Sequence, residues 1–110
     1  VVPQAGAAGE WTDGLFEAEI QVAALQNGYY AALVNRVGRE GELEFAGESF
    51  VADPDGQVIA RAPRGRDHVL YADCDFAKNA ASHAARHFLE DRRPPVYRAM
   101  GLTDPGREGR

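Results

Sequence analysis

The sequence predicts an α+β fold, in which a mixed β-sheet packs against two main helices, and three observations support this prediction. Residues 29–34 (YYAALV) form a continuous apolar run, which is typical of a strand buried on both faces of its sheet. Residues 50–60 contain two short β-rich runs separated by a turn sequence. Residues 15–27 and 77–88 repeat apolar side chains at helical spacing. At 110 residues, the chain has the length of one small domain.

The first helix is expected to follow a glycine-rich loop, residues 6–14, in which Trp11 would serve as a packing anchor. Either Thr12 or Asp13 can act as the N-cap, and Asn27-Gly28 supplies a left-handed stop. The predicted core-facing stripe consists of Leu15, Ala18, Val22 and Leu25, widened by Phe16, Ile20 and Ala23.

The apolar run of the central strand ends abruptly in Asn35 and Arg36. Layered α/β folds place their ligand sites at the carboxyl ends of buried strands, so these side chains are the first candidates for a site. Residues 38–43, which alternate charge and glycine, are predicted to be a polar loop.

The sequence Asp53-Pro54-Asp55-Gly56 predicts a tight hairpin turn, because Pro54 presets φ and Gly56 tolerates a positive φ. Just before this hairpin lies a small-residue stretch that contains one acid, Glu48. The acid is either part of a site or a rim residue in solvent.

The second half of the chain is predicted to contain a strand at residues 68–73 and a second helix capped by Asp75. Pro94-Pro95 is expected to end this helix. Its shared face consists of Ala77, Ala81, Ala84 and Phe88. Residues 101–110 are polar and rich in Gly and Pro, so we expect a disordered tail after a folded unit at residues 1–100.

The composition excludes several classes of protein. A net charge of −5 argues against a nucleic-acid or anionic-membrane surface. No apolar run approaches the length of a transmembrane helix, and a single cysteine cannot form an intramolecular disulfide. We therefore predict a cytoplasmic protein that binds neither nucleic acid nor membrane, and we predict no cofactor.

Two motifs suggest chemistry but are better explained as structural. His83 and His87 have the i, i+4 spacing of metal ligands, yet no third ligand cluster accompanies them, so no metal site is predicted. Cys74 lies between Asp73 and Asp75, whose carboxylates would suppress the thiolate that a nucleophile needs. We expect Cys74 to be structural.

Five segments in order resemble the carboxyl-terminal half of the nitrilase-like carbon–nitrogen hydrolases. That family shows an N-R-x-G strand end, an F-x-G-x-S-F segment, a D-P-x-G hairpin and a terminal D-R-R-P-x-x-Y. The matching segments here are NRVG (35–38), FAGESF (45–50), VADPDGQVIA (51–60), HVLYADCD (68–75) and HFLEDRRPPVY (87–97). Any one of them would be a weak signal, but five in the same order are specific.

The resemblance implies an α-β-β-α sandwich, of which this chain would form a part. It also implies a mechanism in which a cysteine attacks the substrate carbon, a glutamate acts as general base and a lysine stabilises the developing charge. All three catalytic residues would belong to an amino-terminal half that precedes the position matching Val1. No residue of this chain is therefore assigned a catalytic role.

The motif match places Gln4, Asn35, Arg36 and Glu48 on the wall of a substrate pocket. For Asn35 and Arg36 a purely structural role is equally expected, since a buried strand end also needs donors and acceptors for its loops. A carboxylate at Glu48 would favour a cationic substrate group such as an amine.

The predicted function is hydrolysis of a non-peptide C–N bond in a small amide or N-carbamoyl substrate, by an enzyme that is a homodimer or higher homo-oligomer when full length. The amidase and N-carbamoyl amidohydrolase branch is favoured over nitrile hydrolysis. The alternative is a truncated, non-catalytic paralogue that acts as a pairing subunit.

Overall fold

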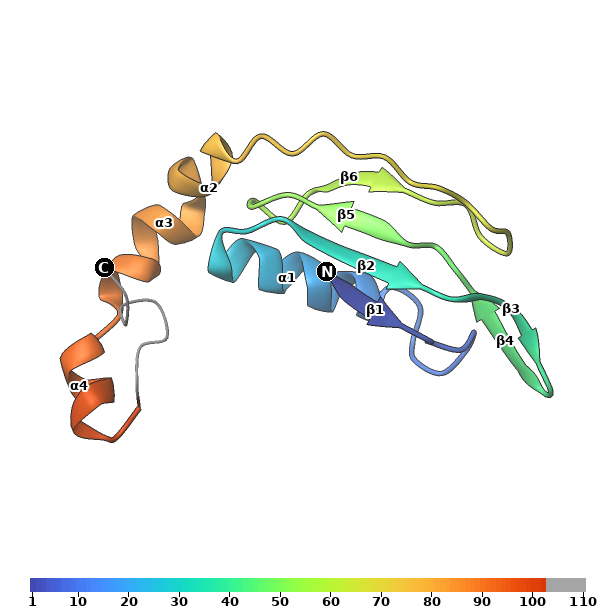
Figure 1. The fold of residues 1–110 in the computed structure, drawn as a ribbon, viewed down its shortest axis with the longest axis horizontal. Helices are drawn as coiled ribbons and strands as arrows, with labels where there is room; N and C mark the ends of the chain where they lie inside the picture. The colour runs from blue at the N-terminus through green and yellow to red at the C-terminus, as the bar shows by residue number, and fades with distance from the viewer. Residues whose placement is uncertain (103–110) are drawn as a thin grey trace.

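The computed structural model describes residues 1–102, which form a four-stranded mixed sheet with a small hairpin at one end (Figure 1). The strand order is β1-β2-β5-β6, with β1 parallel to β2 and the other neighbours antiparallel. The strand bounds are Val2–Gln4 for β1, Ala31–Asn35 for β2, Phe50–Ala52 for β5 and Val58–Arg61 for β6. The predicted mixed sheet is confirmed, and β2 is a central strand as predicted. Burial on both faces is not seen within residues 1–102, because Ala31 and Leu33 are buried against α1 whereas Val34 is 50% exposed. The predicted tail lies outside the described residues from residue 103 onward.

One long helix, α1 (Leu15–Asn27), packs across the sheet beneath β2 and β5 (Figure 1). It ends at Gly28, whose φ of 64° makes the predicted left-handed stop. The predicted N-cap is wrong, because Gly14 at φ 87° occupies that position and makes no side-chain cap. The backbone carbonyl of Thr12 instead accepts from the Leu15 N–H at 3.1 Å.

The predicted core-facing stripe of α1 is also wrong in part. Ile20 and Ala24 are the buried residues of the helix, whereas Leu15, Ala18 and Val22 are exposed. The helix carries apolar residues on several sides, so spacing alone could not select the packed side. The core consists of Ile20, Ala24, Ala31, Leu33, Phe50 and Ala52.

The β5–β6 hairpin is confirmed, and its turn is held by the buried side chain of Asp53. Asp53 Oδ1 accepts from the backbone N–H groups of Asp55 and Gln57, each at 3.0 Å. Gly56 has φ 77°, and a Cβ there would lie 2.9 Å from the carbonyl of Gln21 in α1. The turn therefore packs closely on the helix because residue 56 has no side chain.

The predicted polar loop at residues 38–43 is a second hairpin instead. It consists of β3 (Val37–Glu40) and β4 (Leu43–Ala46), which pair antiparallel with a turn that includes Gly41 at φ 59°. The charged residues Arg39 and Glu44 face each other across the pair. Exposed strands tolerate charges on both faces, which is why the composition resembled a loop.

Residues 68–73, predicted to be a strand, have no regular secondary structure. They belong to an extended segment that runs alongside β6 (Figure 1). Residues 68–73 form no β-bridge with any of the described residues, and the bridge that lies nearest along the chain joins Arg64 to Gly47. The stretch was predicted to be a strand because it contains apolar side chains such as Tyr71. It forms none because no neighbouring strand pairs with it within residues 1–102, and Tyr71 is 84% exposed.

The second predicted helix is broken into short pieces that lead away from the sheet (Figure 1). Ser82 interrupts it with ψ 160°, and its Oγ caps the next piece by accepting from the Ala85 N–H at 3.2 Å. Pro94 and Pro95 begin the last helix and do not end the previous one, in keeping with the preference of Pro for the first turn. The pieces are α2 (Ala77–Ala81), α3 (His83–His87), the 3-10 turn η1 (Leu89–Asp91) and α4 (Pro94–Ala99).

Candidate functional site

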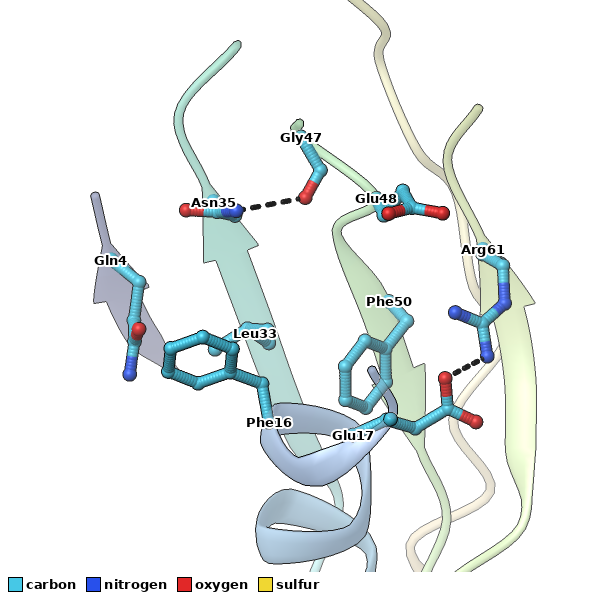
Figure 2. Close-up of a pocket in the computed structure, with 10 residues that line it drawn as sticks. Gln4, Phe16, Glu17, Leu33, Asn35, Gly47, Glu48, Phe50 and Arg61 are labelled. Atoms are coloured by element: carbon cyan, nitrogen blue, oxygen red, sulfur yellow. Dashed lines mark hydrogen bonds and ion pairs between the residues drawn. The ribbon is translucent and has the colours of Figure 1, made fainter. Parts of the chain in front are cut away.

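A pocket of about 110 Å³ lies at the carboxyl ends of the parallel strands β1 and β2, beside the start of α1 (Figure 2). The register places Gln4 of β1 directly beside Asn35 of β2, so both strand ends reach the same edge of the sheet. The lining residues are Gln4, Gly14, Phe16, Glu17, Leu33, Asn35, Gly47, Glu48, Phe50 and Arg61. Three of the four predicted site residues, Gln4, Asn35 and Glu48, therefore meet at one pocket.

The side chain of Asn35 joins three segments of backbone at this edge. Its Oδ1 accepts from the N–H groups of Gly6 and Arg36, at 2.9 and 3.0 Å. Its Nδ2 donates to the carbonyl of Gly47 at 3.0 Å (Figure 2) and to that of Gly6 at 3.4 Å. Asn35 thus links the loop after β1 to the loop between β4 and β5.

Glu48 lies on that second loop in an uncommon conformation. It is the only non-glycine residue with positive φ, 55°, within residues 1–102, and it follows Gly47 at φ 74°. Its carboxylate is 3.4 Å from Arg64 Nη1, and the side chain is 40% exposed. Glu48 is thus a lining residue of the pocket, and its side chain is partly open to solvent.

The opposite wall combines aromatic rings with an ion pair. Phe16 and Phe50 line the pocket, and Trp11 stacks on Phe16 with ring centroids 4.4 Å apart. The predicted packing anchor is confirmed only in part, because Trp11 makes this contact but remains 45% exposed. Glu17 of α1 pairs with Arg61 at the end of β6 (Figure 2). The Arg61 guanidinium also lies 5.6 Å from the ring centroid of Phe50, within cation–π range. The lining thus carries two carboxylates and one guanidinium.

Sequence reasoning missed Phe16, Glu17 and Arg61 as parts of this lining. Phe16 and Glu17 were assigned only to the helix, although the first turn of a helix that follows a strand end commonly borders a site. Arg61 reaches the pocket because the β5–β6 register places it beside Phe50. Extending the predicted hairpin by one residue would have found it.

Arg36 does not line this pocket. Its guanidinium pairs with Glu40 of β3 and lies 4.7 Å from the ring centroid of Phe45. Arg36 instead lines a neighbouring, larger hollow of about 320 Å³, which Asn35 and Glu48 also line. In this conformation Arg36 supports the β3–β4 hairpin.

The other two candidate motifs lie apart from the pocket. Cys74 is half-buried in the extended segment and is not among the lining residues. His83 and His87 contact each other, with ring centroids 4.5 Å apart. Among the described residues, no group of three His, Cys, Asp or Glu side chains could hold a metal ion. No helix in residues 1–102 has the length and hydropathy needed to cross a bilayer.

The family model described as Carbon-nitrogen hydrolase matches residues 15–83, which include α1, strands β2 to β6 and four of the five motif segments completely. The chain belongs to the carbon–nitrogen hydrolase family. The resemblance predicted from the five motif segments is thus confirmed.

Individual members of the carbon–nitrogen hydrolase family match over most of this chain. An N-carbamoylputrescine amidase from Solanum tuberosum is 32% identical over 78 residues, covering 64% of this chain and 26% of the relative. A carbon–nitrogen hydrolase from Helicobacter pylori G27 superposes with a TM-score of 0.70 at 26% identity, covering 89% of this chain and 38% of that structure.

An amidase from Nesterenkonia sp. AN1, solved with the acetamide moiety of fluoroacetamide covalently added at its active-site cysteine, matches with a TM-score of 0.61 and 28% identity. The match covers 86% of this chain and 32% of that one. These superpositions confirm the predicted α+β fold of the carbon–nitrogen hydrolase type. The chain spans about 30% of the length of the first curated relatives that it matches.

Proposed function

We propose that this chain is the carboxyl-terminal part of an enzyme that hydrolyses the C–N bond of small amides or N-carbamoyl compounds. The observation that carries the proposal is the meeting of Gln4, Asn35 and Glu48 around one pocket at the carboxyl ends of parallel strands, in a carbon–nitrogen hydrolase. The matches to an N-carbamoylputrescine amidase and to an amidase with an active-site cysteine favour amide over nitrile substrates.

The proposed chemistry is covalent catalysis by a cysteine that lies in a part of the enzyme outside this chain. Its thiolate adds to the carbonyl carbon, and the C–N bond breaks as the nitrogen takes up a proton from the glutamate and leaves as ammonia or an amine. An amide leaves a thioester on the cysteine, and an N-carbamoyl compound leaves an S-carbamoyl group. Water that gives its proton to the glutamate then adds to this acyl-enzyme, and the thiolate re-forms as the carboxylic acid departs, or as carbamic acid departs and breaks down to carbon dioxide and ammonia. A lysine stabilises the negative charge on the carbonyl oxygen in both additions. Cys74 takes no part, because it does not reach the pocket.

The residues of this chain would bind the end of the substrate that does not react. Glu17 is already paired with Arg61, whereas Glu48 has only a long contact, at 3.4 Å, with the exposed Arg64. The Glu48 carboxylate is therefore the acceptor available to a cationic group, and the rings of Phe16 and Phe50 provide apolar surface beside it. N-carbamoylputrescine, which the potato relative is named for, is a carbamoylated diamine with such a group.

We further propose that the complete enzyme is a cytoplasmic homodimer or higher homo-oligomer. Exposed apolar side chains of the carboxyl-terminal pieces, including Phe88, Leu89 and Val96, support an interface there. Light scattering of the complete enzyme tests this part, and a monomer would contradict it.

The decisive experiment measures ammonia release by the complete enzyme from N-carbamoylputrescine and from δ-ureidovalerate, which have the same carbamoyl group and opposite terminal charges. We expect turnover of N-carbamoylputrescine. Glu48→Gln should raise the KM for N-carbamoylputrescine by a factor equivalent to about 1–3 kcal/mol of binding free energy, and should change the KM for δ-ureidovalerate less. No turnover of any amide or carbamoyl substrate by the folded enzyme would contradict the proposal and favour the non-catalytic subunit.

A further inference from the structure

We propose that Asn35 is a positioning residue, which holds the Glu48 carboxylate at the pocket and does not itself bind substrate. This inference rests on the proposed function, in which Glu48 receives the cationic end of the substrate. It assigns the charge preference of the pocket to a pair of residues, of which only Glu48 contacts the ligand.

The first step of the argument is that the Asn35 amide has no capacity left for a ligand. A carboxamide offers two N–H donors and two oxygen lone pairs. Here the oxygen accepts from Gly6 and Arg36, and the nitrogen donates to Gly47 and Gly6. All four partners are backbone groups of this chain. A substrate could bind Asn35 only by displacing one of them.

The second step concerns the backbone of Glu48. A residue with a Cβ is unfavourable at φ 55°, because the side chain crowds the adjacent carbonyl. Such a conformation persists only where neighbouring contacts fix it, and it commonly marks a functional site. Glycine would occupy the position without strain, so this sequence has a carboxylate at a position where the backbone disfavours any side chain.

The third step identifies the contacts that fix it. On one side of Glu48, the Gly47 N–H donates to the Arg36 carbonyl at 2.9 Å and the Gly47 carbonyl accepts from Asn35. On the other side, the Ser49 carbonyl accepts from the Ala62 N–H at 2.7 Å. Within residues 1–102, the Asn35 amide is thus the one side chain that forms a hydrogen bond with the peptide group between Gly47 and Glu48. Without that bond, this peptide can rotate and carry the carboxylate away from the pocket.

The test is a double-mutant cycle in the complete enzyme, read by competitive inhibition with butylamine and butyrate, which have similar size and opposite charge. The measured quantity is the charge ratio, defined as Ki for butyrate divided by Ki for butylamine. We expect Glu48→Gln and Asn35→Ala each to lower the charge ratio by about tenfold, the effect of one charged hydrogen bond. The double variant should lower it no further, because both changes remove the same interaction.

Ser49→Ala is the matched control. The Ser49 hydroxyl accepts from the Asn35 N–H at 2.9 Å and donates to the Asn35 carbonyl at 3.3 Å, so it braces the same strand end without contacting Gly47. This variant should lose thermal stability and keep the charge ratio. If Asn35→Ala does not fold, Asn35→Ser replaces it, since its short hydroxyl cannot span the distance to the Gly47 carbonyl.

The outcomes separate the two proposals. A charge ratio lowered by Glu48→Gln but not by the Asn35 variant overturns the positioning role and leaves the proposed function intact. Factors that multiply in the double variant, or an equal loss in Ser49→Ala, also overturn the positioning role. A ratio unchanged by Glu48→Gln overturns both, because Glu48 would then not be the cation receptor.

Discussion

The sheet with its helix α1 and the carboxyl-terminal region from residue 68 to residue 102 are stabilised in different ways. The first has a buried core centred on Leu33 and Phe50. The second exposes Tyr71 and Phe76 at 84% and 72%. It contacts the first where Ser82 and the buried Ala84 approach Gly28, where the Phe76 ring meets Tyr30 edge-on, and through polar contacts such as that of Lys78 with Asp53. Apolar burial therefore holds the site in place, whereas the carboxyl-terminal region depends on a small number of attachment points.

The largest expected effect compares one aromatic residue in each region. Phe50→Ala should cost about 3–5 kcal/mol of unfolding free energy, because the side chain is fully buried and leaves a cavity. Phe76→Ala should cost about 1 kcal/mol or less, because the ring is 72% exposed and packs edge-on against Tyr30 alone among the described aromatic pairs. Urea unfolding of the complete enzyme measures both. Similar losses would show that another part of the enzyme covers Phe76.

The next effect tests the attachment point at Gly28. Gly28→Ala should cost about 2–4 kcal/mol, because φ is 64° and the new Cβ would lie 2.4 Å from Ser82 Oγ. Gly41→Ala is the control, since its φ of 59° is similar and nothing lies within 4 Å. It should cost only the conformational part, about 1–2 kcal/mol. Equal losses in thermal unfolding would show that Ser82 moves aside and that the close approach is unimportant.

A smaller effect distinguishes the hairpin turn from its link to α2. Asp53→Ala removes the buried acceptor for two backbone N–H groups and should cost about 1–3 kcal/mol. Lys78→Ala removes only the partner at 3.4 Å, which is half exposed, and should cost about 0–1 kcal/mol. Denaturant titration of both variants measures this difference. If Lys78→Ala lost more unfolding free energy than Asp53→Ala, Asp53 would stabilise the protein mainly through its ion pair with Lys78 and not through the turn.

The smallest expected effect is a gain in unfolding free energy, and it concerns Glu48 in the candidate site. Glu48→Gly should raise the unfolding free energy by up to about 1 kcal/mol, because glycine adopts φ 55° without strain. It should also abolish the preference for amine substrates. Glu48→Ala loses the carboxylate but keeps the strain, so it should lose the preference without gaining stability. Calorimetry and KM measurements on both variants check this, and a destabilised Glu48→Gly would contradict the strain argument.

Local signals in the sequence predicted the elements with a strong physical signature. The central strand, the Asp53–Gly56 turn and the stop at Gly28 follow from apolar runs and from backbone preferences of particular residues. The packed side of α1 could not be predicted, because close approach to the sheet selected Ala24 over larger side chains. The break at Ser82 was missed because a serine inside an apolar pattern does not reveal whether its hydroxyl will cap.

The candidate site was predicted only where it lies on the strand ends. The strand end and the motif segments identify Gln4, Asn35 and Glu48, so these three residues could be predicted from local sequence alone. Glu17 and Arg61 meet across 44 positions of the chain, and only the packing of α1 on the hairpin brings them together. That the Asn35 amide is saturated by backbone groups required the positions of three loops at once.

The left-handed backbone at Glu48 also makes residue 48 an indicator of whether the pocket is in use. Mutation to glycine at such a position is favoured by stability, because glycine removes the backbone strain. A carboxylate is maintained there only while selection for substrate binding opposes that mutation. Relatives that no longer bind a cationic substrate group should therefore carry Gly or Asn at this position while their cores are unchanged, and the residue found there should indicate whether the pocket still receives a cation.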